Sequence, residues 1–168
     1  MIRMARLFVG VWIPEDVTET LMSLPRKDQR GARFVRPENW HITLRFLGDA
    51  HPGDAIDALS GIVVARPSVR LGPAVDVLDE RALVVPATGL DDLAADVAER
   101  TRHVGSEPQR KRFFGHLTIA RVKSHVPMPR TLGALVDAWF DVTEIALIQS
   151  RLHSDGARYE TVETFPLG

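Results

Sequence analysis

One short pattern occurs twice in this chain, as His41-Ile42-Thr43-Leu44 and again as His116-Leu117-Thr118-Ile119. Each copy alternates polar and apolar residues, which is typical of a half-buried β-strand. In such a strand His and Thr share one face, while the two aliphatic residues face a core. Two strands of this kind, brought together, would place two imidazoles opposite each other over a common cleft.

The segments around the two copies follow the same order. A strand ends at a proline, Pro14 or Pro86, and a helix with an acidic start comes next. The motif histidine lies 27 residues after the first proline and 30 residues after the second. We therefore expect an internal duplication within one domain, 1–168, with halves of roughly 1–79 and 80–168 that are related by a pseudo-twofold axis.

The remaining pattern mixes helices and strands with gaps of hairpin length. Helices are expected at 15–24, 54–64, 90–102 and 131–139. Strands are expected at 6–13, 40–47, 69–78, 81–86, 113–119, 141–152 and 159–165, the third of them broken near Gly72-Pro73. This mixture predicts an α+β fold of two duplicated lobes, each mainly antiparallel sheet with helices outside, and an active site in the cleft between them. A doubly wound fold is less favoured, because no Gly-rich phosphate loop follows a strand.

Composition limits the classes of function. The chain is 45% hydrophobic and 26% charged, as in ordinary globular proteins, and no apolar run reaches the ~18–20 residues of a membrane span. Residues 1–6 lack the apolar core of a secretory signal, and there is no cysteine, so a cytoplasmic location is expected. A monomer is expected because no exposed apolar stripe is evident. A net charge of −1 restricts any nucleic-acid contact to a local basic patch.

The doubled motif favours acid–base chemistry. One copy alone would carry little weight, because a single such histidine is more often structural. Packing, however, does not require the same imidazole and the same hydroxyl twice. Near neutral pH one imidazole can accept a proton while the other donates one, which suits displacement at a phosphodiester. The hydroxyls of Thr43 and Thr118 can donate to the phosphate oxygens. Neither a metal nor a cofactor is expected, because there is no cysteine, no His-x-x-x-His pair and no carboxylate cluster beside either motif.

Residues 40–48 and 114–121 resemble the two signature motifs of the two-histidine phosphoesterase superfamily. Within it, the chain is similar to the RNA 2′,3′-cyclic phosphodiesterases, historically called 2′-5′ RNA ligases, and residues 6–11 and 147–152 share this likeness. The resemblance implies a bilobal α+β fold and metal-independent opening of RNA 2′,3′-cyclic phosphate ends to 2′-phosphomonoesters, with reverse 2′-5′ ligation in some relatives. It also implies that His41 is the proton donor and His116 the proton acceptor, an assignment that the residues alone leave open.

Several arginines are candidates for binding phosphate. Arg121 resembles an arginine that the family keeps after its second motif, although strict alternation would place it on the face opposite His116. Arg45 has the parity of the His41 face. The run Arg110-Lys111-Arg112 is a candidate path for an RNA backbone, although most such runs are solvated surface.

Two aromatic residues near the motifs are candidates for stacking on a terminal base. Phe8 and Trp40 can serve this purpose, but core packing accounts for Phe8 at least as well. Tyr159, after the turn at Asp155-Gly156, is a weaker candidate for contact with the cleft. Gly115 stands where the family often has proline, and glycine would loosen the chain just before the second histidine.

Three functions stay open on this basis. The first is a metal-independent cyclic phosphodiesterase for RNA ends, such as those of tRNA fragments or oligoribonucleotides. The second is a non-catalytic RNA- or nucleotide-binding module that kept the cleft. The third is a related enzyme for a small substrate, such as a 2′,3′-cyclic nucleotide or ADP-ribose 1″,2″-cyclic phosphate.

Overall fold

The computed structural model describes residues 3–79 and 81–168. Met1, Ile2 and Glu80, which the sequence analysis placed in the N-terminal segment and at the boundary between halves, lie outside these residues. The helices are α1 (Glu15–Leu21), α2 (Pro52–Leu59) and α3 (Asp91–Arg100), with a short 3-10 turn, η1, at Pro37–Asn39. The strands are β1 (Ala5–Trp12), β2 (Ala32–Phe34), β3 (His41–Ala50), β4 (Ser68–Leu71), β5 (Asp76–Leu78), β6 (Ala82–Thr88), β7 (His116–Val122), β8 (Ala138–Asp141), β9 (Glu144–His153) and β10 (Gly156–Pro166). None of the helices in these residues has the length and apolar character needed to cross a membrane.

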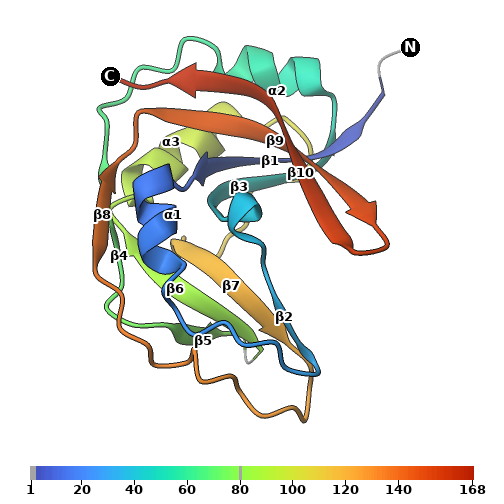
Figure 1. Cartoon of the computed structure of the whole chain (residues 1–168). Helices are drawn as coiled ribbons and strands as arrows, with labels where there is room; N and C mark the ends of the chain where they lie inside the picture. The colour runs from blue at the N-terminus through green and yellow to red at the C-terminus, as the bar shows by residue number, and fades with distance from the viewer. Residues whose placement is uncertain (1–2, 80) are drawn as a thin grey trace.

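The strands form one sheet of order β10-β9-β1-β3-β7-β6-β4-β8, with β2 beside β7 and β5 beside β6 (Figure 1). All the pairings are antiparallel, so the predicted α+β fold with mainly antiparallel strands is confirmed. Among the described residues, β3 and β7 are paired at one position, Ile42 opposite Leu117. We use this joint to define a first lobe, of β1, β3, β9 and β10, and a second lobe, of β2 and β4 to β8. Each lobe therefore combines strands from the first half of the chain with strands from the second half.

One continuous core runs beneath both lobes. Alternate residues of β1, namely Leu7, Val9 and Val11, are buried in it, as are Ile42 of β3 and Leu117 of β7. The amphipathic helices close this core with Val17, Leu21, Leu93 and Val97. The intervening residues of β1 lie on the other face of the sheet, where Phe8 packs with Ala146, Ile148, Trp12 and Tyr159 in a small separate cluster. The period-2 pattern of β1 thus separates the core from the face that carries the histidines.

The helix predicted at 131–139 is wrong. The backbone of this segment bonds across to residues 73–75, through Val75 N–H to Ala134 O, Gly133 N–H to Val75 O and Val136 N–H to Pro73 O. Gly133 has a φ of 85°, which interrupts a right-handed helix, and residues 138–141 form β8 on β4 instead. The apolar spacing was misleading because Leu135 and Trp139 are exposed rather than packed, and a nine-residue helix without a packed face is unstable.

Smaller differences affect the ends of elements. The second helix ends at Leu59 rather than at 64, because the chain turns at Gly61 with a φ of 73°. The strand expected to end at Leu47 continues to Ala50, because it stays paired with the start of β1. The strand expected from 113 begins at His116. The predicted break at Gly72-Pro73 is present and separates β4 from β5.

Candidate active site

The two motifs meet at the joint between β3 and β7. Ile42 and Leu117 are 0% and 1% exposed, so the residues on either side of them project to the opposite face of the sheet. These four residues are His41, Thr43, His116 and Thr118, and all of them line one cavity of about 870 Å³. The sequence expectation that both histidines share one cleft therefore agrees with their positions.

The two imidazoles are held in the same way. Nδ1 of His41 lies 2.7 Å from the carbonyl oxygen of Asn39, and Nδ1 of His116 lies 2.8 Å from the carbonyl oxygen of Phe114. A carbonyl oxygen can only accept, so each Nδ1 must carry the proton that it donates. Each Nε2 is therefore the ring nitrogen that can accept or donate a proton in a reaction. Nε2 of His41 lies 3.2 Å from the hydroxyl of Thr43, which can donate to it.

His41 is surrounded by aromatic rings. The ring of Phe8 lies 4.8 Å from its imidazole, and those of Tyr159 and Trp12 meet it edge-on at 5.0 and 5.9 Å. Burial among these groups lowers the pKa of His41 below 6.5, and the charges of His116 and Arg121 lower it further. The bond to the Asn39 carbonyl opposes this by raising the pKa. The balance favours a neutral His41 in the free protein near pH 7.

His116 has a more open environment. The ring of Phe114 stacks on its imidazole at 5.7 Å and 19°, and Phe114 itself is 50% exposed. The two imidazoles are therefore equivalent in backbone support and differ in their surroundings. One lies in an aromatic enclosure, and the other lies beneath a single exposed ring.

A β-bulge follows the threonine of each motif and changes which residues reach the cavity. On β3 the pairing with β1 shifts by one residue between Thr43 and Arg45, and on β7 the pairing with β6 shifts between Thr118 and Ala120. An extra residue reverses the alternation beyond it. Arg121 is therefore brought onto the cleft face, where it lines the cavity, and Phe46 takes the equivalent place on β3.

The expectation that Arg45 shares the His41 face is wrong for the same reason. Arg45 is 6% exposed, and its guanidinium donates to the hydroxyl of Thr101 and to the carbonyl oxygens of residues 46, 101, 104 and 106. Part of the side chain reaches the cavity wall, but the charged group is occupied by the loop that follows α3. It ties β3 to this loop, and each of its three nitrogens already donates to a neighbouring oxygen.

The aromatic residues expected to stack on a base are buried. Trp40 is 1% exposed, donates to the Val35 carbonyl and lies outside the cavity lining, so that prediction is wrong. Phe8 lines the cavity but is also 1% exposed, because it packs beneath His41. Two other rings that line the cavity, those of Phe46 and Phe114, are exposed at 47% and 50%, and neither was a candidate for this role from the sequence. The sequence did contain a sign that Phe46 reaches the cavity. Phe46 comes five residues after His41, as Arg121 comes five residues after His116, so the two occupy equivalent positions in the two copies.

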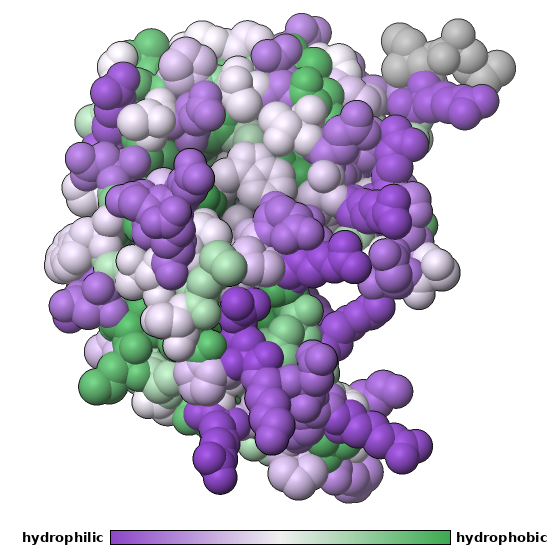
Figure 2. Space-filling model, in the orientation of Figure 1, coloured by the Kyte–Doolittle hydropathy of each residue, from purple (hydrophilic) through white to green (hydrophobic). Residues whose placement is uncertain are grey.

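The cavity wall is more cationic than anionic. Arg6, Lys111, Arg112 and Arg121 line it, against Asp79 and Asp91. Arg110, from the same basic run, is exposed and lies outside the lining. Figure 2 shows hydrophilic side chains gathered on the side of the molecule that carries the β9–β10 hairpin and β2. Tyr159, also from this hairpin, lines the cavity and contacts His41.

Gly115 fits closely rather than loosely. A Cβ at this position would stand 2.4 Å from the carbonyl oxygen of Ala87 on β6. The backbone of Ala87 also donates to the carbonyl of Gly115 at 2.8 Å. Glycine therefore allows β6 to approach the residue before His116, and the expected loosening is wrong.

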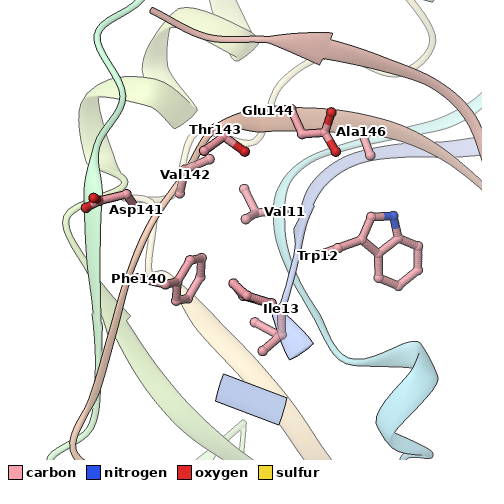
Figure 3. Close-up of a pocket in the computed structure, with 10 residues that line it drawn as sticks. Val11, Trp12, Ile13, Phe140, Asp141, Val142, Thr143, Glu144 and Ala146 are labelled. Atoms are coloured by element: carbon pink, nitrogen blue, oxygen red, sulfur yellow. The ribbon is translucent and has the colours of Figure 1, made fainter. Parts of the chain in front are cut away.

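A second hollow, of about 220 Å³, lies between the end of β1 and the connection from β8 to β9 (Figure 3). Val11, Ile13, Phe140 and Val142 are turned toward it, and its lining also includes the polar residues Asp141, Thr143 and Glu144. Trp12, at its edge, also packs against His41. In the part of the chain that the structure describes, no three His, Cys, Asp or Glu side chains gather as a metal site would require.

Known proteins share this architecture. The chain is 30% identical to the RNA 2′,3′-cyclic phosphodiesterase of Aquifex aeolicus, over 99% of both chains, and 29% identical to that of Thermus thermophilus, over 96% of this chain and 90% of the relative. The crystal structure of TT0787 from Thermus thermophilus superposes with a TM-score of 0.82 at 26% identity, over 96% of this chain and 97% of that one. E. coli LigT, crystallised with 3′-AMP, shares the fold with a TM-score of 0.81 at 22% identity, over 98% of both chains. Residues 11–72 match the LigT-like phosphoesterase family. With its two motif histidines on one cavity, its antiparallel fold and these full-length relatives, the chain belongs to the LigT-like phosphoesterase family.

Proposed function

We propose that this protein is a hydrolase that opens RNA 2′,3′-cyclic phosphate ends to give 2′-phosphomonoesters. The observation that carries the proposal is the pair of imidazoles that point Nε2 away from matched backbone carbonyls into one cavity. Full-length relatives named RNA 2′,3′-cyclic phosphodiesterase support the substrate class. The cationic cavity wall supports an anionic ligand.

The reaction needs one proton taken and one given. In the proposed roles, Nε2 of His116 accepts a proton from water as the water oxygen forms a bond to phosphorus. The bond from phosphorus to O3′ breaks, and Nε2 of His41 protonates the departing oxygen. The phosphate stays on O2′, so the product is a 2′-phosphomonoester. Thr43, Thr118 and Arg121 bind the non-bridging oxygens, where negative charge accumulates.

Substrate binding prepares His41 for its role as proton donor. Burial keeps the pKa of His41 low in the free protein, which favours the neutral imidazole. A bound cyclic phosphate brings a negative charge beside it, and an opposite charge favours the protonated form. The pKa of His41 therefore rises when the substrate is bound, so His41 takes up the proton that it later donates to O3′.

The proposal is tested with an oligoribonucleotide that carries a defined 2′,3′-cyclic phosphate end, incubated with the full chain in EDTA. We expect a 2′-phosphate product, distinguished from the 3′ isomer by chromatography against standards. A 3′-phosphate would reverse the position of the leaving oxygen and refute the assigned donor side. Loss of turnover in EDTA would refute the metal-independent part of the proposal.

The same assay separates the two alternatives. A binding module would hold the oligonucleotide tightly without turnover. An enzyme for small substrates would open 2′,3′-cyclic mononucleotides and leave the oligonucleotide intact. We favour RNA ends because the cationic lining extends to Lys111 and Arg112 of the basic run, which a mononucleotide would not need.

We also propose that 1–79 and 80–168 are copies of one ancestral unit within a single domain. In support, β1 and β3 on one side of the joint correspond to β6 and β7 on the other, and the bulge after the motif recurs. A cytoplasmic location and a monomeric state stay predictions, to be tested by cell fractionation and by light scattering.

A further inference from the structure

Two exposed phenylalanine rings line the cavity, one beside each histidine. Phe46 packs against Phe8 at 5.7 Å, and Phe8 in turn packs against His41 at 4.8 Å. Phe114 stacks directly on His116. Rings of this size that stay half-exposed on a cavity wall suit stacking by a nucleobase, which is sequence-tolerant because every base has a π-face.

The proposed reaction places the terminal nucleoside on the His41 side. The ribose keeps O2′ and O3′, and His41 protonates O3′, so the ribose and its base lie toward His41 and Phe46. Hydrolysis then uses only a water molecule on the His116 side. A water molecule does not need an aromatic ring, so hydrolysis gives Phe114 no binding role.

The cavity has room for more than one nucleoside. Its volume of about 870 Å³ is near the upper end of the roughly 300–1,000 Å³ typical of small-molecule sites. Lys111 and Arg112, which precede Phe114 in the chain, line the same cavity and supply positive charge for a second backbone phosphate. The His116 side thus combines a stacking ring, cationic groups and the proton acceptor.

We propose that Phe114 binds the base of a second nucleoside, whose 5′-hydroxyl takes the place of water at His116, and so controls how the enzyme divides its substrate between 2′-5′ joining and hydrolysis. This inference rests on the proposed function and deepens it. In the joining step, the 5′-oxygen bonds to phosphorus and gives its proton to Nε2 of His116. The bond to O3′ breaks, and O3′ takes the proton of His41. The product is a 2′-5′ phosphodiester with a free 3′-hydroxyl, so the strained ring supplies the bond energy and no nucleotide cofactor enters.

The experiment measures both products in one reaction. The full chain is incubated with an oligoribonucleotide that ends in a 2′,3′-cyclic phosphate and with increasing concentrations of a second oligoribonucleotide that carries a 5′-hydroxyl. For Phe114→Ala, we expect the ratio of joined to hydrolysed product to fall about tenfold, through a higher KM for the 5′-hydroxyl strand. Phe114→Trp should restore the ratio, because it keeps a stacking surface.

Two control variants isolate the effect. Phe46→Ala should lower both products together and leave the ratio unchanged, because both reactions use the terminal nucleoside. Val63→Ala, at an exposed residue outside the cavity lining, should change neither product. If Phe114→Ala lowers both products equally, the ring only positions His116 and the inference is wrong.

The outcomes also separate this inference from the proposed function. Wild-type protein that forms the 2′-phosphate but neither joins strands nor cleaves a 2′-5′-linked dinucleotide would overturn the role of Phe114 and leave the hydrolase standing. Wild-type protein that forms no 2′-phosphate from any cyclic end would overturn the proposed function, and this inference with it.

Discussion

The strands β3 and β7 carry the same motif and use it in different surroundings. Each begins at a histidine held by the carbonyl two residues before it, and each has a bulge after its threonine. Beyond the bulge, however, β3 has Arg45 and Phe46 where β7 has Ala120 and Arg121. The buried arginine anchors β3 to a loop, and the exposed arginine of β7 faces the cavity. The backbone of the site is thus duplicated, but the side chains after the bulge differ, so the His41 side and the His116 side of the cavity are not equivalent.

The largest effect should come from removing either imidazole. We expect His41→Ala and His116→Ala each to lower the rate of cyclic phosphate opening by about 10²–10⁴-fold, since one loses the acid and the other the base. Steady-state kinetics measures this, and His103→Ala, at an exposed residue outside the cavity, is the control. A variant of either motif histidine that kept nearly the full rate would show that its assigned role is wrong.

Substituting the two arginines should have different effects: loss of Arg45 should lower stability, and loss of Arg121 should lower activity. Arg45→Ala leaves several backbone carbonyls unpaired, so the free energy of unfolding should fall by about 2–4 kcal/mol in urea titrations. Arg121→Ala should leave that free energy within about 0.5 kcal/mol and lower the rate about 10²-fold, because a phosphate ligand is lost. If Arg121→Ala has a lower free energy of unfolding than Arg45→Ala, the assignment of a structural role to Arg45 and a phosphate-binding role to Arg121 is wrong.

The residue before each histidine gives a smaller test. Gly115→Ala places a methyl group 2.4 Å from the Ala87 carbonyl, so β6 and β7 must separate. We expect a loss of about 1–3 kcal/mol in stability and a lower rate as His116 shifts. Gly53→Ala, in α2, is the matched control, because its new methyl group would contact nothing within 4 Å. Equal stabilities for the two variants would mean that the chain at Gly115 adjusts freely.

The smallest effect should be a shift in pH dependence. A general acid works only while protonated, and the pKa of His41 in the free protein lies below 6.5, so kcat/KM should already decline as the pH rises through that region. Arg121→Gln removes a positive charge that lowers this pKa. Its descending limb should therefore move to higher pH, even though its maximum is lower. NMR titration of the His41 ring measures the same pKa directly, and an unchanged or lower value would contradict this coupling.

The sequence predicted much of this molecule because period-2 patterns report which face of a strand is buried. His41, Thr43, His116 and Thr118 were placed correctly on one cleft for that reason. The pattern could not predict the bulges, which insert one residue and reverse the parity of Arg45 and Arg121. It also could not separate Phe8 from Phe46, because burial depends on whether β9 and β10 cover a side chain. The false helix at 131–139 arose because apolar spacing does not reveal where backbone bonds go.

The interleaved strand order has a consequence for the chain as a whole. In the first lobe β1 pairs with β9, and in the second β6 pairs with β4, so each half supplies a neighbour that the other half lacks. A fragment of 3–79 or of 81–168 would leave a strand edge bare and open to self-association. Each half therefore needs the other half to fold, so we expect that neither motif histidine can be presented by one half alone.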